Sequence, residues 1–212
     1  GRFGNSVHAV STFDVDNIDY IIHAACPTNS TTMAECPVEI IDTIYQLTYN
    51  SLCLAKRTNA RYMYLSSMEV YDNLSGLVDE TKHGIFDLSR NRSSYPCGKQ
   101  LAELLVNSFH NEYDVNTSIV RLSQIFGPGI LPTDTRFFTA IINKVLNNDD
   151  IILNTTGEKW HNSCFINDAI YYILHILSLD CNDTINITNE SYCHSINELC
   201  SSIINILNST SK

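Results

Sequence analysis

The chain is poor in positive charge, in paired cysteine motifs and in long hydrophobic runs. Its 212 residues contain 13 Lys and Arg against 23 Asp and Glu, which gives a formal net charge of -10. This acidic balance argues against nonspecific binding to nucleic acid or to anionic membranes. No apolar run reaches the roughly 20 residues of a membrane span, and the first residues lack the charged-then-apolar order of a signal peptide. We therefore expect a cytoplasmic protein with neither a nucleic-acid nor a membrane partner.

The eight cysteines lack the Cys-x-x-Cys spacing that is typical of zinc sites and redox motifs. They fall mostly in apolar segments, so we expect reduced thiols in or near the core rather than disulfides. His110, His161 and His175 show no metal-ligand spacing with acidic residues. The sequence therefore predicts no metal site.

Apolar strand-like segments alternate with segments of helical periodicity along the chain. Hydrophobic residues make up 44% and charged residues 17%, which is enough apolar material for a packed core. Strands are predicted at residues 19–25, 61–67, 116–122, 150–153 and 184–188. Helices are predicted at residues 37–55, 93–109, 137–146, 167–179 and 196–207. This alternation favours an α/β fold with a parallel sheet, and the Gly-Pro-Gly turn at 127–129 marks the start of a second, smaller lobe.

Ser67, Tyr95 and Lys99 stand out as a group. Ser67 ends a predicted strand, whereas Tyr95 and Lys99 lie four residues apart at the start of a predicted helix and so share one face of it. A lysine ammonium favours a phenolate, and we expect it to lower the pKa of Tyr95 from about 10 towards neutrality. Such a tyrosine can take a proton from a sugar hydroxyl while hydride leaves the same carbon. The same spacing of a tyrosine and a lysine also occurs on helices without a catalytic role. The serine that precedes them is what favours catalysis here.

Five segments of the chain match, in order, the motifs of one enzyme family. They are Asp-Tyr-Ile-Ile-His-Ala-Ala at 19–25, Leu-Ser-Ser-Met-Glu-Val-Tyr at 65–71, Tyr-Pro-Cys-Gly-Lys at 95–99, Arg-Leu-Ser-Gln-Ile-Phe-Gly-Pro-Gly at 121–129 and Phe-Ile-Asn-Asp-Ala at 165–169. The chain thus resembles the extended short-chain dehydrogenase/reductases, in particular the NAD-dependent nucleotide-sugar epimerases, dehydratases and decarboxylases. The resemblance implies a partial Rossmann-like parallel sheet in residues 1–126 and an intertwined, smaller C-terminal substrate lobe in residues 127–212.

The resemblance also implies NAD as cofactor, a nucleotide sugar as substrate and a set of catalytic residues. Ser67, Tyr95 and Lys99 would be catalytic, and Tyr95 and Lys99 would also contact the cofactor, with Lys99 reaching the nicotinamide ribose. Glu69 matches a glutamate that serves as acid or base in the dehydratases, although a solvated carboxylate is an equal alternative. In the family, helices matching 37–55 and 96–109 form a dimer core, so a homodimer is expected.

Cofactor and substrate contacts are implied at five further positions. Ala24 and Ala25 would line the NAD site through their backbone, and Leu65 would lie beneath the cofactor. Gln124 takes the place of an asparagine that contacts the sugar nucleotide. His161 falls where an arginine often holds the nucleotide phosphate, which weakens that contact.

Two departures from the family limit the functional prediction. The Gly-x-x-Gly-x-x-Gly turn that binds the dinucleotide pyrophosphate is not found, because Gly1 and Gly4 lie in a short polar lead. Met68 replaces the aspartate that dehydratases use as general acid, so dehydration is disfavoured. We expect an NAD-dependent epimerase, or else a decarboxylase or dehydratase, that works through a transient keto sugar.

Two alternatives to an active enzyme stay open. The first is an inactive or truncated remnant that binds a sugar nucleotide weakly or only pairs with a partner, because the glycine turn is missing. The second is a regulatory protein that senses the dinucleotide, although sensing does not require the proton-transfer group of Ser67, Tyr95 and Lys99.

Overall fold

A computed structural model describes residues 15–72, 74, 76–130, 134, 136–153, 155–179 and 181–207 of the chain. The contacts divide the chain into two compact units, residues 1–122 with 171–187 and residues 123–170 with 188–212. The polar lead with Gly1 and Gly4 lies outside the described residues.

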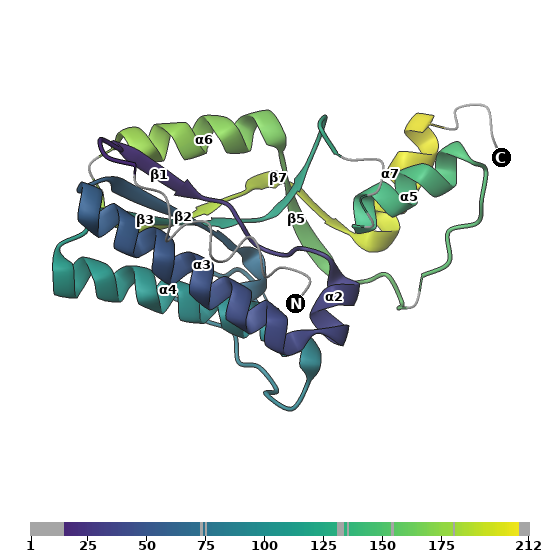
Figure 1. Cartoon of the computed structure of the whole chain (residues 1–212). Helices are drawn as coiled ribbons and strands as arrows, with labels where there is room; N and C mark the ends of the chain where they lie inside the picture. The colour runs from purple at the N-terminus through teal and green to yellow at the C-terminus, as the bar shows by residue number, and fades with distance from the viewer. Residues whose placement is uncertain are drawn as a thin grey trace. The chain divides into compact units, whose positions relative to one another are not determined.

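The first unit contains a four-stranded parallel sheet with the strand order β1-β2-β3-β6 (Figure 1). Its strands are β1 (Tyr20–His23), β2 (Arg61–Ser67), β3 (Thr117–Leu122) and β6 (Thr184–Ile187). The predicted α/β class with a parallel sheet is confirmed. Because all four strands run the same way, their carboxyl ends meet at one edge, where α/β proteins bind ligands.

Two long helices cover one face of this sheet, α3 (Pro37–Thr58) and α4 (Ser94–Tyr113) (Figure 1). Pro37 occupies the first turn of α3, and Asn59 ends that helix in the left-handed conformation. The helices approach closely at Gly98, where an added Cβ would lie 2.9 Å from Ile44 Cδ1. Apolar side chains of both helices and of β2 and β3 form the core between these layers: Ile40, Ile44, Leu52, Tyr62, Tyr64, Ala102, Val106 and Ile119.

Shorter elements complete the first unit. The helix α2 (Ser30–Glu35) precedes α3, and Asn29 caps it by accepting hydrogen bonds from two backbone amides. Two 3-10 turns, η2 (Met68–Tyr71) and η3 (Asn91–Ser93), follow β2 and precede α4. The helix α6 (Ile166–Ser178) returns the chain from the second unit and lies across the other face of the sheet (Figure 1).

The second unit contains a three-stranded sheet with the order β4-β5-β7. Its strands are β4 (Gln124–Phe126), β5 (Trp160–Phe165) and β7 (Asn189–Ser195), of which β7 is antiparallel to β5. The helices α5 (Phe137–Leu146) and α7 (Ile196–Leu207) pack through Ile141, Val145 and Cys200.

The structure agrees with most of the predicted elements and corrects one of them. The strand predicted at 150–153 is wrong, because these residues form no strand. Ile151 and Leu153 instead pack against the cluster between α5 and α7, so their apolar character reflects helix contacts rather than a sheet. The strand at 160–165 and the strand at 189–195 were not predicted.

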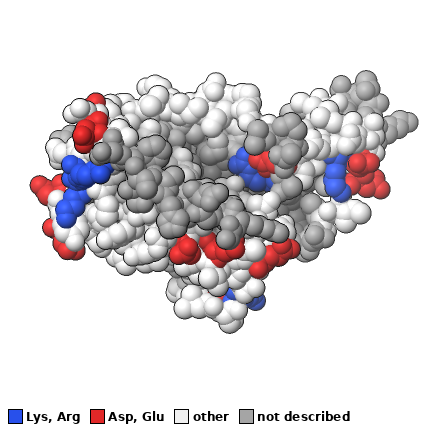
Figure 2. Space-filling view, in the orientation of Figure 1, with Lys and Arg blue, Asp and Glu red and all other residues white. Residues whose placement is uncertain are grey.

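All eight cysteines are free thiols; Cys164 and Cys200 are buried, whereas Cys53 and Cys193 are exposed. Within the described ranges, no group of three metal-ligating side chains could hold a metal ion, and no helix has the length and apolar character of a membrane span. On the face in Figure 2, the described Lys and Arg side chains lie in small groups beside acidic ones.

Candidate active site

The structure places the Ser67 hydroxyl near the Tyr95 phenol. Ser67 is the last residue of β2, and Tyr95 lies in the first turn of α4. The Ser67 hydroxyl oxygen accepts a hydrogen bond from the amide of Glu69 at 3.2 Å and so caps η2. The Ser67 hydroxyl acts to lower the pKa of Tyr95.

Lys99 lies one helical turn beyond Tyr95 and is buried. Its ammonium donates a hydrogen bond to the Leu65 carbonyl oxygen at 2.8 Å, and the thiol of Cys26 is near enough to act on its pKa. It also lies 4.7 Å from the ring centroid of Tyr64 and 5.8 Å from that of Tyr95. Burial lowers the pKa of Lys99, because the charged form loses solvation.

The expected effect of Lys99 on Tyr95 is wrong for this structure. The pKa of Tyr95 is raised above its ordinary value, chiefly because the side chain is buried, with only 6% exposed. The charges of Cys26 and Glu69 act in the same direction. Desolvation of the phenolate thus outweighs the effects of the Ser67 hydroxyl and of the Arg92 charge, which lower the pKa. The phenol is neutral in the chain as it stands.

Glu69 lies on η2, two residues beyond Ser67, and forms an ion pair. Arg92 donates a hydrogen bond from Nη2 to Glu69 Oε2 at 2.6 Å, and both side chains are half-exposed. Arg92 belongs to η3, immediately before α4. The pair therefore connects the turn that follows Ser67 with the turn that precedes Tyr95.

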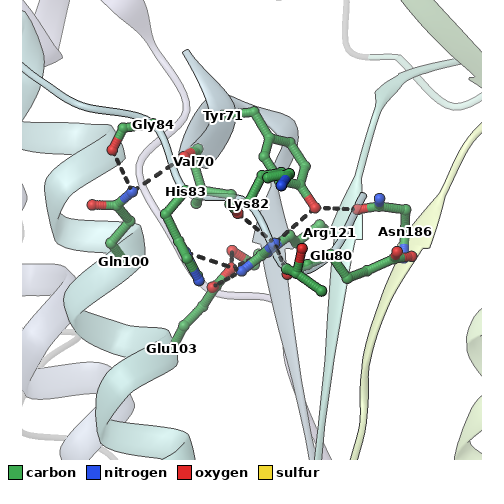
Figure 3. Close-up of polar contacts among 12 residues, drawn as sticks. Val70, Tyr71, Glu80, Lys82, His83, Gly84, Gln100, Glu103, Arg121 and Asn186 are labelled. Carbon is green, nitrogen blue, oxygen red and sulfur yellow. Dashed lines mark hydrogen bonds and ion pairs between the residues drawn. The ribbon is translucent and has the colours of Figure 1, made fainter. Parts of the chain in front are cut away.

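A buried ion pair joins β3 to α4 (Figure 3). Arg121 on β3 donates to both carboxylate oxygens of Glu103 on α4, at 3.0 and 2.7 Å. Ser66 donates to Glu103 Oε1 at 2.5 Å. Because Ser66 and Arg121 are register partners on β2 and β3, this network ties α4 to the strand end that carries Ser67.

The same arginine holds the segment between η2 and η3 against the sheet (Figure 3). Arg121 Nη1 donates to the Tyr71 hydroxyl at 2.7 Å and to the Glu80 carbonyl oxygen at 3.0 Å. Tyr71 in turn donates to the side-chain oxygen Oδ1 of Asn186 on β6 at 2.8 Å. The backbone N–H of Asn186 donates to Glu80 Oε1 at 2.8 Å. Gln100 adds bonds from α4 to two backbone carbonyls of the same segment.

The residues expected to line a cofactor lie at the carboxyl edge of the sheet. Ala24 and Ala25 follow β1 directly and are exposed. Leu65 is half-buried on β2, and its carbonyl oxygen holds Lys99. His23, at the end of β1, is buried against Thr48 Oγ1 at 3.3 Å, and burial lowers its pKa to about 4. His23 is thus a packed, neutral histidine.

The two expected substrate residues belong to the second unit. Gln124 is the first residue of β4 and is half-buried, in register with Ser163. His161 is half-buried on β5, in register with His194 on β7. Their substrate contacts stay predictions.

Cys26 and Arg92 were not predicted as parts of the site. Cys26 acts on the pKa of Lys99, and Arg92 places its guanidinium carbon 5.7 Å from the Tyr95 ring centroid. Arg92 could have been found from its spacing, since three residues before Tyr95 is one helical turn. Cys26 follows the Ala24–Ala25 segment, but no spacing rule marks a thiol at that position as a neighbour of Lys99.

The chain matches a known family and several known enzymes in sequence. The model of the NAD dependent epimerase/dehydratase family matches residues 5–188. The UDP-glucuronic acid decarboxylases 5 and 3 of Arabidopsis thaliana are 30% and 29% identical to this chain over 89% of its length. The chain covers 55% of each of these two proteins and so spans about half the length of the curated relatives that it matches.

Solved structures show the same fold. The UDP-N-acetylglucosamine 4-epimerase of Methanobrevibacter ruminantium superposes with a TM-score of 0.84 at 19% identity, over 95% of this chain and 66% of that one. The UDP-glucuronic acid 4-epimerase of Bacillus cereus, solved with UDP-glucuronic acid and NAD, superposes with a TM-score of 0.77 at 22% identity, over 89% and 59% of the two chains.

Proposed function

We propose, from the premise that the chain belongs to the NAD dependent epimerase/dehydratase family, that it oxidises a hydroxyl-bearing carbon of a nucleotide sugar to a ketone. The keto sugar then reacts further, and its ketone is reduced again within the same turnover. The observation that carries this proposal is the contact of Ser67 with Tyr95 at the strand end where Lys99 is held.

Tyr95 is the proton acceptor in this proposal. Its hydroxyl lies near that of Ser67, so the two hydroxyls can hold the same substrate oxygen, Ser67 as donor and Tyr95 as acceptor. NAD, when bound in its oxidised form, would supply a hydride acceptor and a positive charge. Positive charge is what Tyr95 needs, because burial keeps its phenol neutral in the free chain.

The residues around Lys99 fit the ribose end of NAD. An ammonium has three N–H groups, and the Leu65 carbonyl oxygen accepts from one of them at 2.8 Å. The Lys99 ammonium can therefore also donate to a ribose hydroxyl. Ala24 and Ala25 present short, exposed side chains, so a ligand can approach the backbone there. The sequence contains no glycine-rich turn for the pyrophosphate, and we assign no residue to it.

Decarboxylation of a sugar acid is the proposed reaction, in place of the epimerisation expected first. Relatives that cover most of this chain are named UDP-glucuronic acid decarboxylases. Oxidation of the carbon next to the one that bears the carboxylate gives a β-keto acid, which loses carbon dioxide and leaves the ketone for reduction. Met68 stands where dehydratases have an acid, so dehydration is not proposed.

We also propose a homodimer through α3 and α4. Val38 on α3 and Leu104 on α4 are exposed by 77% and 62%, and Ile41 and Leu101 are also exposed. Burying such apolar area stabilises a helix–helix contact by roughly 25 cal/mol per Å². Sedimentation of the 212-residue chain and of Leu104→Glu checks this proposal. A dimer that the charged variant dissociates is expected, and a wild-type monomer would contradict it.

Binding and turnover test the enzymatic function. The 212-residue chain is titrated with NAD by calorimetry and then incubated with UDP-glucuronic acid, and carbon dioxide and the sugar product are measured. Tyr95→Phe removes the proton acceptor and is expected to abolish turnover while binding is retained. Tyr113→Phe, at the exposed end of α4, is the matched control and is expected to behave like the wild type.

Three outcomes bear on the proposal. An epimer without carbon dioxide would support the oxidation step and replace decarboxylation by epimerisation. Unchanged turnover in Tyr95→Phe would overturn the role of Tyr95. A chain that binds no NAD would favour the non-enzymatic remnant over the enzyme.

A further inference from the structure

Two cations flank the ring of Tyr95, although the Tyr-x-x-x-Lys motif contains only one. Lys99 Nζ lies 5.8 Å from the ring centroid and the Arg92 guanidinium carbon 5.7 Å. Both distances lie within the roughly 6 Å over which a cation is attracted to an aromatic ring. Lys99 is buried and already bound by the Leu65 carbonyl oxygen, whereas the Arg92 side chain is 42% exposed.

Arg92 is also the partner of the one acidic side chain that acts on Tyr95. Its Nη2 lies 2.6 Å from Glu69 Oε2. The negative charge of Glu69 raises the pKa of Tyr95, and the positive charge of Arg92 lowers it. The ion pair therefore sets two opposed charges beside one phenol, and each offsets part of the effect of the other.

The remaining charged and titratable groups near Tyr95 come from three elements. They are Cys26 after β1, Tyr64 on β2 and Lys99 on α4. Of these, Cys26 acts to raise the pKa of Tyr95. The Ser67 hydroxyl adds a neutral donor that lowers it. Arg92 is thus half-exposed, whereas Lys99, the other cation near Tyr95, is buried and donates to the Leu65 carbonyl oxygen.

We propose that Arg92 is a positioning residue for proton transfer at Tyr95, because it holds the Glu69 carboxylate in an ion pair and places a positive charge over the phenol. This role rests on the proposed function, in which Tyr95 accepts the proton. Loss of Arg92 removes a positive charge and leaves the negative charge of Glu69 unpaired, which disfavours the phenolate of Tyr95. Loss of the Glu69 charge leaves the positive charge of Arg92 unpaired, which favours the phenolate.

A titration of the phenol itself tests the proposal without any turnover. The chain is produced with difluorotyrosine, whose phenol ionises at lower pH than that of tyrosine, and fluorine NMR follows each phenol as pH rises. The signal missing in Tyr95→Phe identifies Tyr95. Arg92→Gln is expected to raise the titration midpoint of Tyr95 by about one pH unit. Glu69→Gln is expected to lower it, and Arg92→Lys, which keeps the charge, to leave it near the wild-type value.

Arg90→Gln is the matched control. Arg90 lies two residues before Arg92 on the same turn, is 78% exposed and pairs with Asp87 at 3.3 Å. It is expected to leave the Tyr95 midpoint unchanged. The proposal is overturned if Arg92→Gln leaves the midpoint in place, or if Arg90→Gln moves it as far. Because this titration needs neither cofactor nor substrate, failure of turnover would count against the proposed function and not against this role of Arg92.

Discussion

His23 makes the free energy of unfolding depend on pH in a window set by its burial. Its pKa is about 4 in the folded chain, against an ordinary value of 6.5, because burial beside Lys99 penalises the imidazolium. Between these values the unfolded chain binds more protons than the folded chain, so stability rises with pH. The contribution is complete above the ordinary pKa and is lost as pH falls towards the folded pKa. The linkage relation gives a loss of about 2 kcal/mol between about pH 7 and about pH 5.

Urea unfolding at the two pH values measures this loss. His23→Gln has a side chain that does not titrate and is expected to lose about 2 kcal/mol less than the wild type over the same interval. His175→Gln, on the exposed side of α6, controls for removal of a histidine. If the wild type and His23→Gln lose the same free energy, the reasoning from burial is refuted, because some other group then causes the loss.

Two further predictions concern the packing beneath and beside the site. Glu103→Gln leaves the buried Arg121 without its charge partner and is expected to cost about 3–5 kcal/mol in urea unfolding, whereas Glu35→Gln on exposed α2 costs little. A loss below about 1 kcal/mol for Glu103→Gln would contradict the buried ion pair. Gly84→Ala puts a Cβ against the backbone of residues 71 and 72, whereas Gly98→Ala meets only the end of a flexible isoleucine side chain. Gly84→Ala is therefore expected to be the more destabilising, by about 1–3 kcal/mol, and the opposite order of thermal midpoints would refute this account.

The fold could be predicted where burial leaves a periodic apolar pattern. The strand at 61–67 and the helices at 137–146 and 196–207 have the bounds that the sequence predicts. β5 and β7 have no such pattern, because their sequences are largely polar and most of their residues are exposed or half-buried. Their pairing comes from contacts between segments about thirty residues apart, such as His161 with His194. Such contacts between distant segments produce no periodic pattern in the local sequence, so the sequence does not predict them.

The site could be predicted as a set of neighbours, because a strand end and the following helix start meet at one edge of a parallel sheet. The sequence therefore places Ser67 next to Tyr95. The partners of Lys99 could not be found in this way, since one is the carbonyl oxygen of Leu65, which any residue there would present. A second neighbour is the thiol of Cys26, which lies in the segment after β1.

The ionisation of Tyr95 is the property that a motif predicts least well. Spacing determines that Lys99 lies one turn away, but the pKa of Tyr95 depends on how much solvation the phenolate loses and on how much positive charge is left uncompensated. Here the ring is 6% exposed and the lysine is bound to a carbonyl, so desolvation prevails. As the proposed proton acceptor, Tyr95 requires additional positive charge, and Arg92, outside the motif, places a guanidinium carbon 5.7 Å from its ring centroid.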